Sequence, residues 1–250
     1  MNQVNRQGPS AIARTFRHAG WEFRLNVRNG EQLLLLVIIP LIVLVTLTQT
    51  SVIGGEQWTV ARALSASLSI SIIAAGFTSL AISTAFERRS GTLLAMGTTP
   101  LSRLELVLGK GISIFLLGVL SASALAIVSM FIGWRPQISA LLIFPVLLLG
   151  ILSVSGVAFL LAGTCRAELV LALANAIFVI AMIFGGIVFQ FDGFLQRVVD
   201  LFPPAAIYTL LGNLIGSSSQ LNQSTFGAAL LLFIWAVAGN LLAARFFRWR

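Results

Sequence analysis

Residues 86–110 form the one sizeable charged, turn-rich segment between the long apolar runs of this chain. The segment holds two carboxylates and four cations, namely Glu87, Glu105, Arg88, Arg89, Arg103 and Lys110. Hydrogen bonds between oppositely charged groups are stronger than bonds between neutral groups, so these side chains can fix a joint at a membrane surface. We expect Glu87 to anchor this joint by pairing with the arginines of the segment.

The same segment predicts a helix-turn-helix elbow. Gly91 and Thr92 break the chain, residues 93–96 form a short apolar helix, and a Thr-Pro pair ending at Pro100 stops it. The S-x-x-E sequence at residues 102–105 is a capping box, which starts the next helix cleanly.

Catalytic chemistry is missing from the sequence. A P-loop would need a glycine at position 104 and a hydroxyl at position 111, where the chain has Leu104 and Gly111, so this nucleotide-binding motif is not present. Cys165 and His18, each the single residue of its type, provide neither a disulfide nor a set of metal ligands, and we expect His18 to be solvated. An intramembrane enzyme would also need a paired nucleophile and base. We therefore predict a non-enzymatic subunit with no cofactor of its own.

The composition places the chain in a membrane. Of its 250 residues, 58% are hydrophobic and 10% are charged, and the mean hydropathy is +0.98. In soluble domains about a quarter of the residues are charged. The net charge of +8 could suggest nucleic-acid binding, but the cations do not cluster on a soluble domain. Membrane topology explains them better.

Six apolar runs are close to the roughly 20 residues that a helix needs to cross the hydrocarbon core. They cover residues 33–52, 63–85, 107–132, 140–162, 169–190 and 226–244. Thirteen of the sixteen cations then fall on the side of the N-terminus, which puts both termini in the cytoplasm by the positive-inside rule. No charge falls at the bilayer midplane, which argues against a secondary transporter or an ion channel. The sequence thus predicts an all-α integral membrane protein with a six-span domain over residues 33–250.

Residues 1–32 are expected to form an amphipathic helix in the plane of the membrane interface. Pro9 and Ser10 mark its start. One face carries Ile12, Phe16, Ala19, Phe23 and Val27, another carries Arg14, Arg17, Arg24 and Arg28, and Trp21 suits the depth of the lipid headgroups. A helix packed on a partner subunit is an alternative that is compatible with the first.

Polar and small residues inside the spans suggest packing seams. The second run carries small residues at every fourth position, namely Ala63, Ser67, Ser71, Ala75, Ser79 and Ser83, which permits close helix contact. Asn175 and Asn240 are the carboxamides well inside spans. An interhelical hydrogen bond is the default explanation for each, and contact with a transported substrate is the alternative.

Residues 191–225 form the largest segment expected outside the cell. Two apolar stretches that are too short to span flank Pro203 and Pro204, and the only tyrosine, Tyr208, follows them. We expect a helical hairpin that dips into the outer leaflet, with a simple surface loop as the alternative.

Across residues 86–110, the sequence FERRSGTLLAMGTTPLSRLELVLGK resembles the first cytoplasmic loop of type-2 ABC transporter permeases. Span count, topology and the Phe-Pro-Pro sequence ahead of Tyr208 extend the resemblance over the chain. In that family the loop is a coupling helix that docks into a separate ATPase subunit, and short external helices shape the exit of the pathway. The residues that the resemblance assigns to coupling are Glu87, Arg88, Arg89, Gly91, Thr92, Leu93, Leu94, Met96, Pro100 and Arg103. The alternative is an ordinary basic cytoplasmic loop.

The resemblance implies a permease subunit of an ATP-driven exporter, with ATP bound by the partner. Six helices from one chain enclose little room for a pathway, so we expect two permease copies, identical or paralogous, with two ATPase subunits. The aliphatic and Phe-rich spans favour an amphipathic drug or lipid over a polysaccharide, and the scarcity of Lys among the cations suggests a bacterial cell membrane. A non-transporting scaffold or assembly factor, and a polysaccharide exporter, are the alternatives.

Overall fold

The computed structural model describes residues 10–49, 58–92, 95, 102–185, 193–216 and 223–246. None of these residues lies in a strand, so the all-α prediction is confirmed for them. The α-helices are α1 (Ala11–Arg28), α2 (Gly30–Leu33), α3 (Ile39–Gln49), α4 (Val60–Ile73), α5 (Leu80–Arg89), α7 (Arg103–Ile132), α8 (Ile143–Thr164), α9 (Ala167–Phe184), α10 (Gly193–Val199), α11 (Pro203–Ile215) and α12 (Gln223–Phe246). Two π-helical segments, η1 (Leu34–Ile38) and η2 (Ala74–Ser79), and a 3-10 segment, η3 (Ile138–Leu142), join them.

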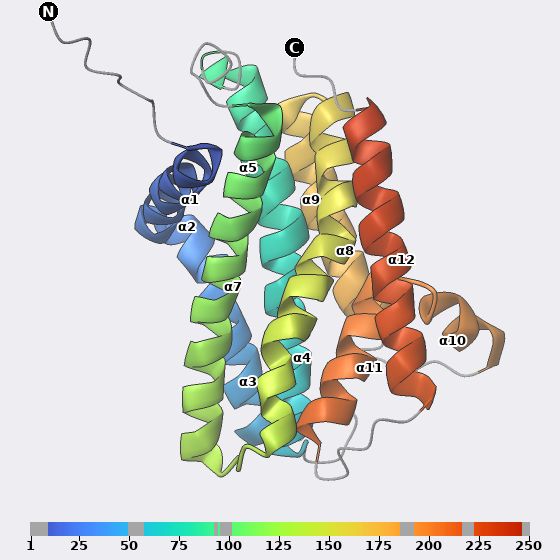
Figure 1. The fold of residues 1–250 in the computed structure, drawn as a ribbon. Helices are drawn as coiled ribbons and strands as arrows, with labels where there is room; N and C mark the ends of the chain where they lie inside the picture. The colour runs from blue at the N-terminus through green and yellow to red at the C-terminus, as the bar shows by residue number, and fades with distance from the viewer. Residues whose placement is uncertain are drawn as a thin grey trace, which may run out of the picture.

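Figure 1 shows a bundle of long helices with α1 beside one end of α7 and α10 projecting from the side. The end of α5, the start of α7 and the last turns of α12 lie at the same end of the bundle as α1. The described ends of the charged segment, helix α1 and the last turns of α12 therefore lie at one end of the bundle.

Four continuous helices are long and apolar enough to cross a membrane, namely Val60–Arg89, Glu105–Ile132, Ile138–Thr164 and Ser224–Phe246. Leu34–Gln49 and Ala167–Ile183 are apolar but shorter, and the expected spans around them extend into residues 50–52 and 186–190, which lie outside the described residues. Helices α10 and α11 meet at a 91° bend and together give the apolar length of a fifth candidate. The structure thus supports a multi-pass membrane protein with four to five candidate spans.

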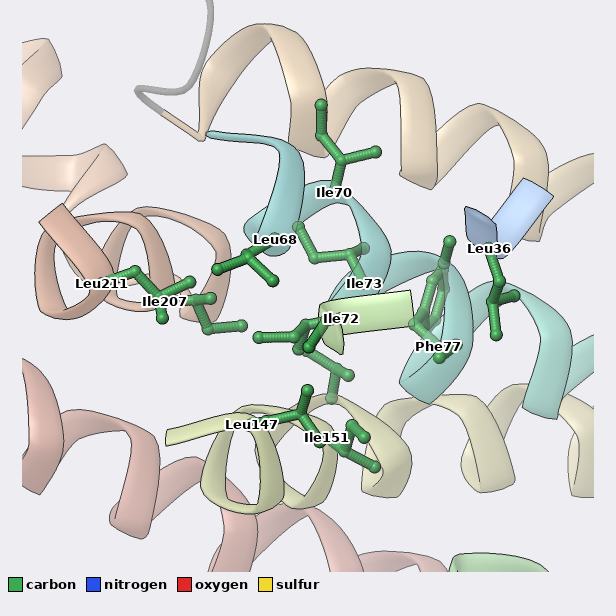
Figure 2. Close-up of a cluster of buried hydrophobic side chains, with 14 of the residues drawn as sticks. Leu36, Leu68, Ile70, Ile72, Ile73, Phe77, Leu147, Ile151, Ile207 and Leu211 are labelled. Atoms are coloured by element: carbon green, nitrogen blue, oxygen red, sulfur yellow. The ribbon is translucent and has the colours of Figure 1, made fainter. Parts of the chain in front are cut away.

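The helix made of α4, η2 and α5 is the core of the bundle. In its most apolar window 83% of the residues are buried, against 28% for Ser224–Phe246. Figure 2 shows Ile72 of this helix close to Leu147 and Ile151 of α8 and to Ile207 of α11, with Phe77 on the side of Leu36. The small residues at every fourth position from Ala63 to Ser83, which we call the small-residue ridge, explain this central position, because small side chains let neighbouring helices approach closely.

A proline in the first apolar helix leaves a backbone carbonyl without its usual hydrogen bond, and hydroxyl groups of two neighbouring helices replace that bond. Pro40 has no N–H and cannot donate the α-helical hydrogen bond to the carbonyl of Leu36. The hydroxyl of Ser121 donates to that carbonyl oxygen at 2.5 Å, and Ser71 Oγ lies 3.1 Å from the same oxygen and 2.8 Å from Ser121 Oγ. Three helices are therefore tied together where the backbone of one of them needs a partner.

Helices α8 and α12 cross at a pair of glycines. A Cβ atom added to Gly156 would lie 2.2 Å from the carbonyl carbon of Gly239, so only glycine allows this approach. One residue further on, Asn240 donates to the carbonyls of Leu152 and Ala236 at 2.9 and 2.8 Å. The interhelical hydrogen bond expected for Asn240 is confirmed.

Candidate functional site

Helix α1 packs on the first turns of α7 with a polar face. Its buried residues are Thr15, His18, Ala19 and Glu22. By contrast, Ile12 and Phe16 of the expected apolar face are 70% and 62% exposed. The helix begins at the expected place, with Ser10 as its N-cap. Its polar residues face the charged partners of α7, and Ala19, Phe23 and Val27 of the expected apolar face pack inward beside them.

Of the residues assigned to membrane contact, Phe16, Trp21, Arg17 and Arg24 are exposed, and Phe23 packs against the core. Their contact with lipid stays a prediction. The prediction of a solvated His18 is wrong, because this side chain is buried against α7.

Lys110 is the centre of a charge cluster that joins three helices. Its Nζ atom lies 2.6 Å from Glu87 Oε1 of α5 and 3.3 Å from Glu22 Oε1 of α1. The Nε2 atom of His18 is 3.7 Å from the same oxygen of Glu22. Gly109 makes room for the imidazole, since a Cβ there would lie 2.3 Å from His18 Cδ2. We call His18, Glu22, Glu87 and Lys110 the ion-pair cluster.

The ion-pair cluster is largely shielded from water. Lys110, Glu22 and His18 are 5%, 6% and 8% exposed. Burial lowers the pKa of His18 below its usual value, the charge of Glu22 raises it by less, and Lys110 lowers it further. With a neutral imidazole, one cation faces two carboxylates. Among the described residues, Glu87 Oε2 and His18 Nε2 are buried without a hydrogen-bond partner.

Further polar contacts extend the ion-pair cluster along α1. Arg14 Nη2 donates to Glu105 Oε1 at 2.7 Å, and Glu105 Oε2 accepts from the backbone N–H of Ser102 at 2.8 Å in the capping box that the sequence predicts. On the other side, Asn26 donates to Ser113 Oγ at 3.1 Å. A polar cavity of about 10 Å³ beside Glu22 and Lys110 has the size that a single water molecule needs.

The expectation that Glu87 pairs with Arg88 and Arg89 is wrong, because adjacent residues of a helix point in different directions. Arg88 instead donates to the carbonyl of Cys165 at 2.5 Å, and Arg89 forms an exposed ion pair with Glu168. The end of α5 is therefore tied both to α7 and to the turn between α8 and α9.

The remaining residues assigned to coupling are described only in part. Gly91 adopts a φ of +74°, a left-handed conformation that favours glycine, and Thr92 Oγ1 lies 2.7 Å from Ser90 Oγ. Leu93, Leu94, Met96 and Pro100 lie outside the described residues, as does the side chain of Arg103. The coupling role of the set stays a prediction.

Three polar residues suggested for a pathway or interface lie on three different helices. Asn240 holds α12 to α8, as described above. Tyr208 on α11 accepts from Arg62 Nε at 3.4 Å, and the Arg62 guanidinium lies 4.2 Å from the centre of the Trp58 ring. Asn175 is exposed on α9, so the structure does not bring the three together.

Sequence reasoning missed the Glu22–Lys110 pair, although two signals were present. Glu22 is the only carboxylate in the cationic helix α1, and Lys110 stands inside the apolar run of α7, where a buried cation needs a carboxylate. Their separation of 88 residues hides the pairing until the fold brings the helices together.

An all-helical bundle with several membrane-length helices and a charge cluster at one end is typical of a multi-pass membrane protein. The sequence profile of the family described as ABC-2 family transporter protein matches residues 42–245. The chain belongs to this family, and it is a permease component of an ABC transporter. No curated protein matches it. Helix α1 lies outside the matched residues, whereas Glu87 and Lys110 lie inside them.

Proposed function

We propose that this chain is the permease subunit of an ATP-driven exporter in a bacterial cell membrane, and that a separate ABC ATPase drives it. Membership of the ABC-2 family supports the permease role. The observation that carries the proposal of coupling is the ion pair between Glu87 and Lys110. These residues stand in the two helices that lead into and out of residues 90–102.

This ion pair holds together the two helix ends that flank residues 90–102, which we call the coupling segment. A displacement applied to residues 90–102 by an ATPase reaches α5 and α7 together, because their ends are bridged at 2.6 Å. Helix α5 continues through η2 into α4, the most buried helix of the bundle. The displacement is thereby carried into the core, and by reciprocity a substrate that favours one permease state shifts nucleotide affinity at the ATPase.

The proposed topology has six spans and a cytoplasmic coupling segment. A single cysteine at Ser102, in a Cys165→Ser background, should react with a membrane-impermeant maleimide only from the cytoplasm, and one at Ser218 only from outside. The opposite pattern at either position would overturn the topology.

The proposed complex contains two permease copies, identical or paralogous, and two ATPase subunits. Asn175 supports this, because an exposed carboxamide in the middle of an apolar helix is costly to leave in lipid and a second copy would cover it. Asn175→Cys should then crosslink between copies in membranes, whereas a cysteine at Leu230, exposed on α12, should not. A purified, active complex with one copy of this chain and no second membrane subunit would refute the stoichiometry.

The proposed cargo is an amphipathic drug or lipid. The apolar character of the spans supports it over a polysaccharide, and accumulation of only a glycan precursor in cells that lack the chain would reverse the choice. The alternative of a non-transporting scaffold is favoured by the same stiff joint, which would equally hold a partner in place.

Transport and ATP turnover, measured together in proteoliposomes with the partner ATPase, separate these functions. Glu87→Ala and Leu94→Asp should leave the chain inserted but uncouple transport from ATP turnover or weaken ATPase association. Glu168→Gln is the matched control, since its exposed ion pair at the same end of the bundle is worth about 0–1 kcal/mol. Unchanged transport and unchanged ATPase stimulation in both test variants would show that the segment is only a connector.

A further inference from the structure

A second feature of the molecule lies away from the ion-pair cluster, at the bend between α10 and α11. A cavity of about 430 Å³ opens there between α9, α10, α11 and α12, with η2 and α8 forming its inner wall. Pockets that hold small molecules have volumes of roughly 300–1,000 Å³. The cavity is therefore large enough for part of a ligand.

The described lining of this cavity is apolar. Among the described residues that line it, every side chain is hydrocarbon except the indole of Trp235, whose N–H already donates to the carbonyl of Leu201 at 3.0 Å. Helix α11 begins with Pro203 and Pro204, so the helix end beside the cavity lacks two of the backbone donors that other helices present. A water molecule needs two to four polar partners, so this cavity holds hydrocarbon or stays empty.

The entrance faces the apolar surface of the bundle. Ile180 of α9, Leu195 of α10 and Phe202 beside α11 line the cavity and are 54%, 46% and 50% exposed. One side of the entrance is held in place, because the Phe202 and Trp235 rings lie 6.1 Å apart and the Trp235 indole donates a hydrogen bond to the carbonyl of Leu201 at the bend. A ligand would enter sideways from the hydrocarbon of the membrane.

We propose that this cavity binds the alkyl chain of an amphiphile within a single subunit. Lipid tails are as apolar as the walls, so the gain on entry comes from the dispersion contacts that an empty cavity lacks. Helix α10 supplies the polar side of the site, since Leu195, Val198 and Val199 line the cavity while Gln196 and Arg197 lie elsewhere on the same short helix and Asp200 follows it directly. A headgroup can rest on this polar side while the chain fills the cavity.

The site is tested on the purified permease in nanodiscs, with no ATPase present, so the result is independent of transport. Two probes carry a diazirine in an alkyl chain, a phospholipid built into the nanodisc and a free single-chain amphiphile added later. After illumination, the modified peptides are mapped. We expect adducts on residues 195–204 and near Trp235. The phospholipid probe reports a resident lipid, and displacement by the free amphiphile reports exchange with free ligand.

Two variants fill the cavity from different helices, Ala181→Phe of α9 and Val198→Trp of α10. Each should lower labelling of residues 195–204 about tenfold, because the added ring takes the space of the chain. Ala238→Phe, on the exposed side of α12, is the matched control and should leave labelling unchanged. Labelling spread evenly over the apolar surface of the wild type, or unchanged in both filled variants, would overturn the proposal.

Discussion

Replacing Lys110 by methionine removes the shared cation of the ion-pair cluster while keeping a flexible side chain of similar length. Glu22 and Glu87 then remain without a counter-charge, with side chains that are 8% and 22% exposed. Removing one partner of a buried ion pair costs about 3–5 kcal/mol, because the remaining charge is left uncompensated. Undocking of α1 would return Glu22 to water. We therefore expect the cost to appear as undocking of α1, with the bundle core intact.

Hydrogen–deuterium exchange of the α1 amides in nanodiscs measures this undocking. A cost of about 3–5 kcal/mol corresponds to exchange that is about 10²- to 10⁴-fold faster in Lys110→Met than in the wild type. Arg17→Met is the matched control on the same helix. Since Arg17 is exposed, its replacement should change the docking free energy by less than about 0.5 kcal/mol.

A triple variant with Glu22→Gln, Glu87→Gln and Lys110→Met separates charge from packing. Replacing a whole buried ionic network is often close to neutral, so α1 should regain protection. Unchanged α1 exchange in the single variant would show that docking does not depend on the ion-pair cluster. A triple variant as poorly protected as the single one would show that docking needs the ion pairs themselves, and not only the absence of an uncompensated charge.

Two further predictions concern pH and close packing. Burial lowers the pKa of His18 below its usual value of 6.5, so undocked α1 takes up the proton first as the pH falls through that value and the docked state loses stability; the protection factors of the α1 amides, which correct for the slower intrinsic exchange at low pH, should be smaller at about pH 5.5 than at about pH 7.5, and His18→Gln should remove the difference. In α8, Gly156→Ala should cost about 1–3 kcal/mol because its Cβ meets the Gly239 backbone, whereas Gly212→Ala in α11 meets nothing within 4 Å and should be neutral or stabilising. Thermal unfolding in detergent tests this pair, and equal shifts in both variants would contradict the glycine contact.

Local sequence patterns predicted the positions of the helices well, because helix caps, helical periodicity and proline bends each depend on residues that are close in sequence. The capping box at Ser102 needs only a hydroxyl and a carboxylate three residues apart. The small-residue ridge correctly marked a packing face because its period matches a helix, and the same period located α1. The bend at Pro203 likewise follows from a residue that cannot continue the preceding helix.

Partners distant in sequence could not be predicted in the same way. The orientation of α1 depends on whether its polar or its apolar side meets protein, and that depends on Lys110 and Glu105 of another helix. Sequence proximity made Arg88 and Arg89 the natural partners of Glu87, yet adjacent helical residues diverge. The shape of the apolar cavity at the bend between α10 and α11 depends on the relative placement of several helices, which no pattern within a single segment encodes.

The two ion pairs of Lys110 are expected to differ in role, one serving the proposed coupling and the other the docking of α1. The Glu87 contact is the shorter, at 2.6 Å against 3.3 Å for Glu22, and both of its residues lie within the family match. Glu22 belongs to α1, outside that match, and neutral His18 beside it supplies no compensating charge. With two carboxylates on one ammonium, the longer contact is the one that can open while the supports of residues 90–102 stay joined. Changes at Glu22 or His18 should therefore loosen α1 alone, whereas changes at Glu87 should also loosen the coupling segment.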